Sequence, residues 1–109
     1  MSYKILRHPL VEHDLRIIVR LIADHAGLGA GPEIALAKLQ EIETAVRRLA
    51  QTPHIGSIRD EISPGLRAIP AGRKAVISFK VDDDARRVLI LCITYGGADW
   101  IGRSVDRDR

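Results

Sequence analysis

The chain of 109 residues contains a single cysteine, Cys92, so the sequence excludes an intramolecular disulfide. Cys92 lies inside the apolar run VLILCI, where a small buried side chain is expected. No apolar stretch approaches the roughly 20 residues that a membrane-spanning helix needs, and the N-terminus lacks the charged start and apolar core of a signal peptide. We therefore expect a cytoplasmic protein without a membrane partner.

The sequence also lacks a polybasic run: its formal net charge is only +3, and charges of both signs are mixed along the chain. This pattern argues against a dedicated nucleic-acid binder, and we expect no specific DNA binding by this chain. Four histidines are present without H-x-x-x-H or C-x-x-C spacing, so no metal site is predicted. The nucleophile-elbow, Walker and dinucleotide glycine patterns are missing as well, and no cofactor is predicted.

The length of the chain favours one domain with one hydrophobic core. We assign that domain to residues 1–100, because the apolar pattern disappears after Trp100. Residues 101–109 are predicted to be a flexible tail unless a partner orders them. The stability margin of so small a domain is thin, so a partner that covers exposed apolar surface is expected to matter.

Apolar side chains recur with the helical period in two segments. In residues 10–25 they fall at spacings of four, three and four, at Val11, Leu15, Ile18 and Ile22. After a glycine-containing loop at 27–31, Pro32 opens a second segment whose apolar positions again repeat every three or four residues. Two amphipathic helices joined by so short a loop are predicted to pack antiparallel.

Strand patterns occupy residues 3–7 and three later segments rich in valine and isoleucine, at 66–69, 74–81 and 87–94. The segment at 74–81 should place Ala75, Ile77, Phe79 and Val81 on one face. The predicted fold class is α+β with two layers. An N-terminal strand and an antiparallel helical hairpin pack on one face of a twisted antiparallel sheet.

The region from 59 to 80 concentrates positive charge and contains Arg59, Arg67 and Arg73. A proline-glycine pair opens one strand and Pro70-Ala71-Gly72 turns it into the next, which predicts Arg67 and Arg73 on either side of one turn. The planar fork of arginine suits phosphate or carboxylate, so this arrangement favours an anion or an acidic protein surface as partner.

Each of these arginines also has a purely structural interpretation. In that interpretation, Arg67 or Arg73 forms an ion pair with a nearby acidic residue and only stabilises the turn. The candidate acidic residues are Asp60, Glu61 and Asp99. The acidic neighbours of Arg59 favour a structural role for that side chain in particular.

Two aromatic residues near the C-terminus are further candidates. Tyr95 ends the last predicted strand beside two glycines, but a tyrosine is a poor general base at neutral pH, which favours packing over catalysis. Trp100 lies in a polar segment, where it either packs on the domain or anchors an interface with another molecule.

The order P-x-I-G-x-x-R-D-E-x-x-P-G-L-R-x-x-P-x-G-R begins at Pro53 and ends at Arg73. It is followed by a hydrophobic strand, an acidic turn and a last strand that ends in Tyr95-Gly96-Gly97-Ala98-Asp99. This order resembles the ParE family of bacterial toxins, within the RelE/ParE superfamily. The opening, with Tyr3-Lys4-Ile5 before Pro9, is similar to that superfamily too, so the resemblance covers nearly the whole chain.

The resemblance implies the toxin of a type II toxin-antitoxin system, which inhibits DNA gyrase and so blocks replication without a catalytic site of its own. It also implies a ParD-like antitoxin whose acidic, amphipathic C-terminal segment wraps the toxin. On this interpretation the target contacts Arg59, Arg67, Arg73 and Trp100. The antitoxin contacts Ile17, Leu21, Arg67 and Arg73.

Two alternatives stay open at this point. The first is a ribosome-dependent messenger RNA endoribonuclease of the RelE type, in which Arg67 and Arg73 hold the phosphate and Tyr95 lies near the attacking hydroxyl. The second is a degenerate member of the family that binds its antitoxin but has lost toxicity.

Overall fold

The computed structural model describes residues 2–26, 29 and 31–108. Within these residues the elements follow in chain order as β1 (Lys4–Arg7), α1 (Val11–Ala26), α2 (Gly31–Arg48), β2 (Ser57–Ile58), β3 (Arg67–Pro70), β4 (Ala75–Asp82), β5 (Arg87–Tyr95) and α3 (Trp100–Arg107). The predicted hairpin and the four predicted strands are confirmed, whereas β2 and α3 were not predicted. Residues 27, 28 and 30 of the predicted loop lie outside the described residues.

In the helical hairpin, the apolar side chains that recur with the helical period are the buried ones. Val11, Leu15, Ile18 and Ile22 of α1 are all at most 6% exposed, and they join the core with residues of α2. The two helices approach each other closely near the loop that joins them. A Cβ atom on Gly31 would lie 2.7 Å from the carbonyl oxygen of Ala23, so only glycine fits there without a shift.

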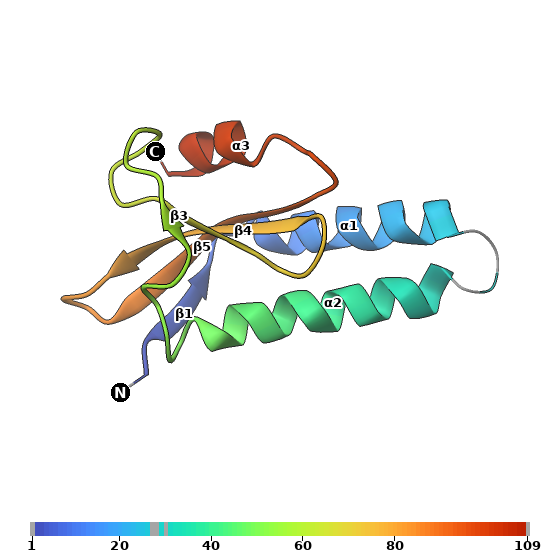
Figure 1. Cartoon of the computed structure of the whole chain (residues 1–109), viewed down its shortest axis with the longest axis horizontal. Coiled ribbons are helices and arrows are strands. Elements are labelled where there is room, and N and C mark those ends of the chain that lie inside the picture. Colours follow the sequence, from blue (N-terminus) through green and yellow to red (C-terminus); the bar gives the residue numbers. More distant parts are fainter. Residues whose placement is uncertain (1, 27–28, 30, 109) are drawn as a thin grey trace.

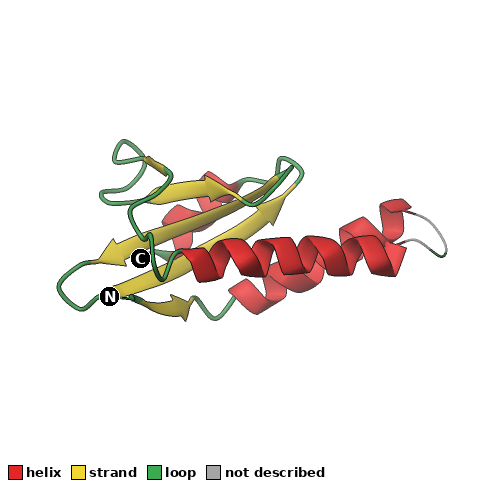
Figure 2. Cartoon of the chain, turned by 60° about the horizontal axis from the view of Figure 1, so that its bottom comes forward, coloured by secondary structure: helices red, strands yellow, loops and turns green. Residues whose placement is uncertain are grey.

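One sheet holds the strands in the order β1-β5-β4-β3-β2 (Figure 2). The pairs β3–β4 and β4–β5 are antiparallel as predicted, the additional strand β2 pairs antiparallel with β3, and β1 runs parallel to β5. The expected antiparallel sheet therefore contains one parallel pair. Because β1 and β5 are separated by most of the chain, no tight turn sets their direction, and a long connection permits parallel pairing.

The two faces of the sheet are covered by different helices. Ala75, Ile77 and Phe79 point toward the hairpin and are at most 1% exposed, and Val81 packs against the same core, as the alternating pattern predicted. The hairpin lies along one face, while α3 lies over the other (Figure 1). The α+β class is therefore confirmed, with α3 as an extra layer over part of the second face.

Residues 101–108 form no flexible tail, because Trp100–Arg107 is the helix α3. The carboxylate of Asp99 caps this helix by accepting the Gly102 N–H at 2.9 Å. Ser104 is fully buried against β4, where its Oγ donates to Ser78 Oγ at 2.6 Å. The helix thus packs through a polar residue, which explains why the segment showed no apolar period.

Candidate functional site

Arg67 and Arg73 do not frame a single turn, although both lie near the β3–β4 connection in sequence. Arg67 begins β3 and stands opposite Phe79, whereas Arg73 lies in the turn beyond the other end of that strand. A strand rises about 3.3 Å per residue, so the length of β3 alone separates them by roughly 10 Å. The two arginines, predicted on either side of one turn, are therefore kept apart by the length of β3.

Arg67 is held in a polar cluster that the sequence did not reveal. Its Nη1 donates to the carbonyl oxygen of His54 at 3.0 Å, and His54 Nε2 lies 2.7 Å from Asp83 Oδ1. The hydroxyl of Tyr3 donates to the same Asp83 oxygen at 2.7 Å. The hydrogen bond from Tyr3, followed by that from His54, lowers the pKa of Asp83 below its ordinary value. No local pattern links these residues, because Tyr3 and Asp83 are 80 positions apart.

Lys38 of α2 lies close to both Arg73 and Tyr95, at a second place on the surface. The guanidinium of Arg73 is exposed and has no hydrogen bond or ion pair within the described part of the chain. Lys38 Nζ donates to the Arg73 carbonyl oxygen at 2.9 Å and to Glu41 at 2.5 Å. The same ammonium lies 5.9 Å from the centre of the Tyr95 ring. This corner thus gathers the half-buried Tyr95 ring, the Lys38 ammonium and the backbone of Arg73.

Arg59 and Trp100 meet on the face of the sheet that α3 covers. The guanidinium carbon of Arg59 lies 5.6 Å from the centre of the Trp100 ring, within cation–π range. Arg59 Nε also pairs with Glu61 at 2.5 Å, and this hydrogen bond lowers the pKa of Glu61. The pairing with Glu61 matches the structural interpretation of Arg59, while the stack with Trp100 presents both side chains as one surface.

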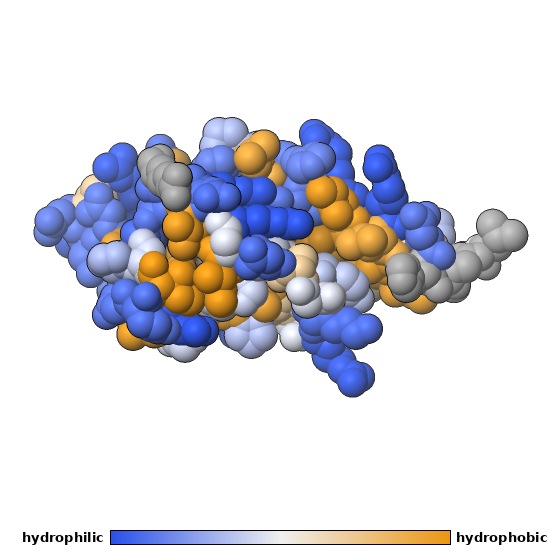
Figure 3. All heavy atoms as spheres, turned by 90° about the horizontal axis from the view of Figure 1, so that it is seen from above, coloured by the Kyte–Doolittle hydropathy of each residue, from blue (hydrophilic) through white to orange (hydrophobic). Residues whose placement is uncertain are grey.

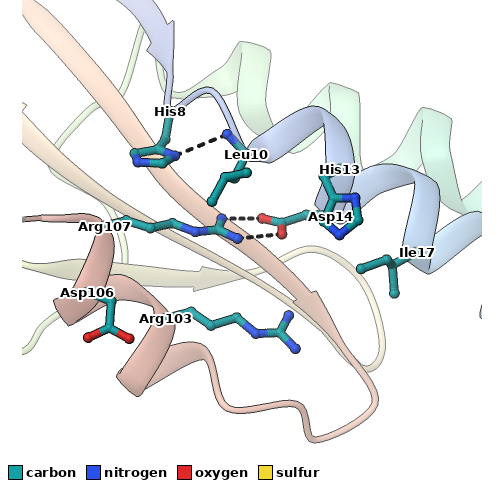
Figure 4. Close-up of a pocket in the computed structure, with 8 residues that line it drawn as sticks. All are labelled: His8, Leu10, His13, Asp14, Ile17, Arg103, Asp106 and Arg107. Atoms are coloured by element: carbon teal, nitrogen blue, oxygen red, sulfur yellow. Dashed lines mark hydrogen bonds and ion pairs between the residues drawn. The ribbon is translucent and has the colours of Figure 1, made fainter.

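Ile17 lies in a cleft of about 540 Å³ between α1 and α3 (Figure 4). Leu10, just before α1, forms one wall with His13 and Ile17 of α1, and Arg103 of α3 stands opposite (Figure 4). Leu21 follows Ile17 by one helical turn on the same side of α1 and is 40% exposed. Viewed from the α3 side, apolar surface continues between hydrophilic side chains toward the end of the hairpin (Figure 3).

The floor of the α1–α3 cleft is an ion pair between residues 93 positions apart. Arg107 donates to both carboxylate oxygens of Asp14, at 2.6 and 2.8 Å, and Asp14 is only 2% exposed. The hydrogen bond with Asp14 raises the pKa of Arg107 above its ordinary value. A bidentate pair of this kind fixes α3 against the start of α1.

The same pair completes the edge of β5. β1 covers that edge only from Arg87 to Ile90. Beyond it, Asp14 Oδ2 accepts the Ile93 N–H at 3.0 Å and Arg107 Nη1 donates to the Leu91 carbonyl at 3.0 Å. Two side chains therefore replace the missing strand, so backbone groups that would otherwise be buried without partners are satisfied.

The described residues offer neither a metal site nor a membrane span. No group of three or more His, Cys, Asp or Glu side chains among them is arranged to hold a metal ion. Likewise, in residues 2–26, 29 and 31–108 no helix combines the length and the apolarity needed to cross a membrane.

Comparison with solved structures shows what the fold resembles. A chain of the chromosomal ParDE toxin-antitoxin system from P. aeruginosa is 27% identical, with a TM-score of 0.64 over 86% of this chain and 96% of that chain. A double mutant of E. coli toxin RelE in the free state has 14% identity and a TM-score of 0.65, with 98% of both chains covered. A chain of the RelBE2 toxin-antitoxin complex from Mycobacterium tuberculosis is 19% identical, with a TM-score of 0.55 over 88% of this chain and all of that one.

Sequence comparison identifies the family to which the chain belongs. No curated protein matches the chain significantly. The family model of the ParE toxin of the type II toxin-antitoxin system parDE matches residues 5–100, well over half of the chain. The RelE and RelBE2 structures, at lower identity, support the fold alone. With its sheet, its hairpin and this match, the chain belongs to the ParE toxin family of type II toxin-antitoxin systems.

Proposed function

We propose that this toxin inhibits DNA gyrase in the cytoplasm and so blocks replication. One observation supports inhibition by binding rather than by cleavage. An endoribonuclease would need Arg67, Arg73 and Tyr95 around one phosphate, but the structure separates them. Arg73 lies with Tyr95 at the α2 corner, whereas Arg67 lies at the other end of β3 with His54. Phosphoryl chemistry requires charge-stabilising groups positioned together at the reacting atoms, and this trio is not positioned so.

The distribution of the arginines suits a large protein partner. Arg59, Arg67 and Arg73 present cations at three different places on the surface. A typical interface with another protein involves roughly 20–30 residues on each side, so a partner the size of gyrase can reach several of these places at once. Arginine and tryptophan, which meet at the Arg59–Trp100 stack, are the residue types enriched at such interfaces.

The test is a supercoiling assay with purified toxin, gyrase and relaxed plasmid in the absence of ribosomes. We expect inhibition, and at least tenfold weaker inhibition by an Arg67→Gln/Arg73→Gln variant. Arg103→Gln is the matched control, because that exposed guanidinium also has no partner among the described residues. Unaffected gyrase together with cleaved messenger RNA in a translating extract would overturn the proposal. Activity in neither assay would also overturn it and would identify a family member that has lost its toxic activity.

One observation favours the endoribonuclease as a second candidate. The Lys38 ammonium lies 5.9 Å from the centre of the Tyr95 ring and donates to the Arg73 carbonyl oxygen, so two basic residues stand near one tyrosine. Tyr95→Phe separates the two functions, because it removes only the hydroxyl. Gyrase inhibition should stay unchanged in this variant, whereas messenger RNA cleavage, if it is the true activity, should disappear.

We further propose that a ParD-like antitoxin neutralises the toxin by direct contact. The support is the ParE family match and the ParDE system to which the P. aeruginosa structure belongs. Ile17 and Leu21, half-buried and 40% exposed respectively, lie where an apolar partner surface can cover them. Alanine at both positions should weaken antitoxin binding about tenfold or more, measured by calorimetry, while the circular dichroism spectrum stays unchanged.

A further inference from the structure

A groove of about 520 Å³, called here the α2–β3 groove, lies between the second half of α2 and the sheet edge at β3. Residues of α2 line one side of it, and residues 55–56 and 69–72 line the other. Its surface is largely apolar, because Ile69 is buried and Ile55 and Ala45 are half-buried against the core. The residues predicted to contact gyrase or the antitoxin do not line this groove, so it is a separate surface.

The two ends of the α2–β3 groove differ in charge. Arg48, the last residue of α2, lines one end, and its exposed guanidinium has no ion pair or hydrogen bond within the described residues. Glu41 lines the other end, where its carboxylate lies 2.5 Å from the Lys38 ammonium. This carboxylate also lies against Gly72, where an added Cβ atom would clash with it. The groove therefore offers a cation at one end and a carboxylate that Lys38 already neutralises at the other.

The edge of β3 adds one hydrogen-bond acceptor to the groove. Within the described residues, β2 pairs only with the first two residues of β3, so Pro70 has no strand beside it on that side. The next residue, Ala71, donates its N–H to the Ala75 carbonyl at 3.0 Å, toward β4. Because the backbone groups of successive strand residues point to alternate edges, the Pro70 carbonyl points to the open edge. Proline has no N–H to donate, so a regular added strand cannot form at this residue.

We propose that the α2–β3 groove binds the C-terminus of another protein that ends in an aliphatic residue. The terminal carboxylate pairs with Arg48, whose planar fork matches its two oxygens. The last side chain packs on Ile55 and Ile69, and the last peptide N–H donates to the Pro70 carbonyl. The end of a polypeptide is the part of it that carries a carboxylate, an apolar side chain and an N–H on one residue, which matches these three features of the groove.

The length and charge of the groove set the size and direction of the bound segment. Glu41 and Arg48 are seven positions apart on α2, which corresponds to about 10 Å. An extended chain covers about 3.3 Å per residue, so about three residues fit. The segment runs antiparallel to β3, from the Gly72 end toward Arg48, because the opposite direction would bring its carboxylate against that of Glu41.

Fluorescence anisotropy with the full-length toxin and short labelled peptides tests the proposal. The first peptide carries a fluorophore and a glycine-serine spacer, and it ends in alanine, valine and leucine with a free carboxylate. A second peptide ends in the carboxamide instead, and a third has glycine in place of the last leucine. Each change should weaken binding at least tenfold, because it removes the charged hydrogen bonds or the buried side chain. Equal affinities of the three peptides, or no binding of any, would overturn the proposal.

Two neighbouring arginines of α2 provide a matched pair of toxin variants. Arg48→Gln should weaken binding of the free acid at least tenfold and remove the difference between acid and amide. Arg47→Gln is the control, because Arg47 is also exposed but donates to Thr44 Oγ at 3.2 Å and does not line the groove. Thermal unfolding of both variants should match that of the wild type. An equal loss of affinity in both, or a preference for the acid that survives Arg48→Gln, would refute the contact.

Amide NMR locates the peptide without any substitution in the toxin. Adding the free acid to isotope-labelled toxin should shift the N–H signals of Gly56 and Gly72, which lie on the sheet side of the groove. The Gly102 N–H, bonded to Asp99 at the start of α3, lies outside the groove and should keep its position. A shift of Gly102 with no shift of Gly56 and Gly72 would place the peptide elsewhere and overturn the assignment.

Discussion

Removing the guanidinium of Arg107 tests whether the C-terminal helix is an integral part of the fold. In an Arg107→Ala variant the Asp14 carboxylate, 2% exposed, loses both hydrogen bonds from the arginine and keeps only the one from the Ile93 N–H. The Leu91 carbonyl loses a donor as well. A buried charge is thereby left without its counter-charge.

The expected cost follows from the burial of the pair. Breaking a buried ion pair by removing one partner costs about 3–5 kcal/mol, out of a total free energy of unfolding of about 5–15 kcal/mol. The side chain of Arg107 is itself 10% exposed, so water can reach part of the space it leaves, and we expect the lower end, about 3 kcal/mol. For a domain of this size that loss lowers Tm by roughly 12 °C or more.

Thermal unfolding followed by circular dichroism measures this effect, with urea unfolding as a second readout of the free energy of unfolding. Arg103→Ala is the matched control, because it removes an exposed arginine from the same helix and should change stability by about 0.5 kcal/mol or less. Deletion of residues 103–109 should destabilise at least as much as Arg107→Ala, because it also removes Ser104 and Asp108. A flexible tail predicts no effect of any of these changes, so an Arg107→Ala variant as stable as the control would refute the reasoning.

Two further predictions concern the hairpin. The hydrogen bond from Arg7 holds the pKa of Glu43 below its ordinary value of 4.5, so the pair stabilises the fold above that pH and its contribution disappears as the pH falls through the lowered pKa. Arg7→Gln should therefore reduce the free energy of urea unfolding at pH 7, by about 1 kcal/mol or less, and the difference from wild type should vanish in acid. Gly31→Ala should lower stability by about 1–3 kcal/mol, because the added Cβ meets the Ala23 carbonyl, whereas exposed Gln40→Ala should not; equal Tm values for the two variants would contradict the close approach.

Local sequence patterns predicted only part of the arrangement of the arginines. The pattern around Arg67 and Arg73 correctly indicated a turn and a strand, because prolines and glycines restrict the backbone locally. It did not indicate that the strand itself separates the two side chains, or that Arg67 meets His54. Those relations depend on strand register and on a loop from another part of the chain, neither of which is encoded by spacing.

The sequence by itself determined the helical hairpin, the main strands and the face of β4 that enters the core, because burial against one layer imposes periods of 3.6 and 2 on apolar residues. Only the tertiary structure decided the parallel direction of β1, the packing of α3 and the pair of Asp14 with Arg107. The last two depend on polar groups that lie far apart in the sequence, 26 positions for Ser78 and Ser104 and 93 for Asp14 and Arg107, and such contacts leave no periodic trace in the sequence. The physical reason is that a buried carboxylate or hydroxyl needs one well-placed partner rather than a repeating apolar face.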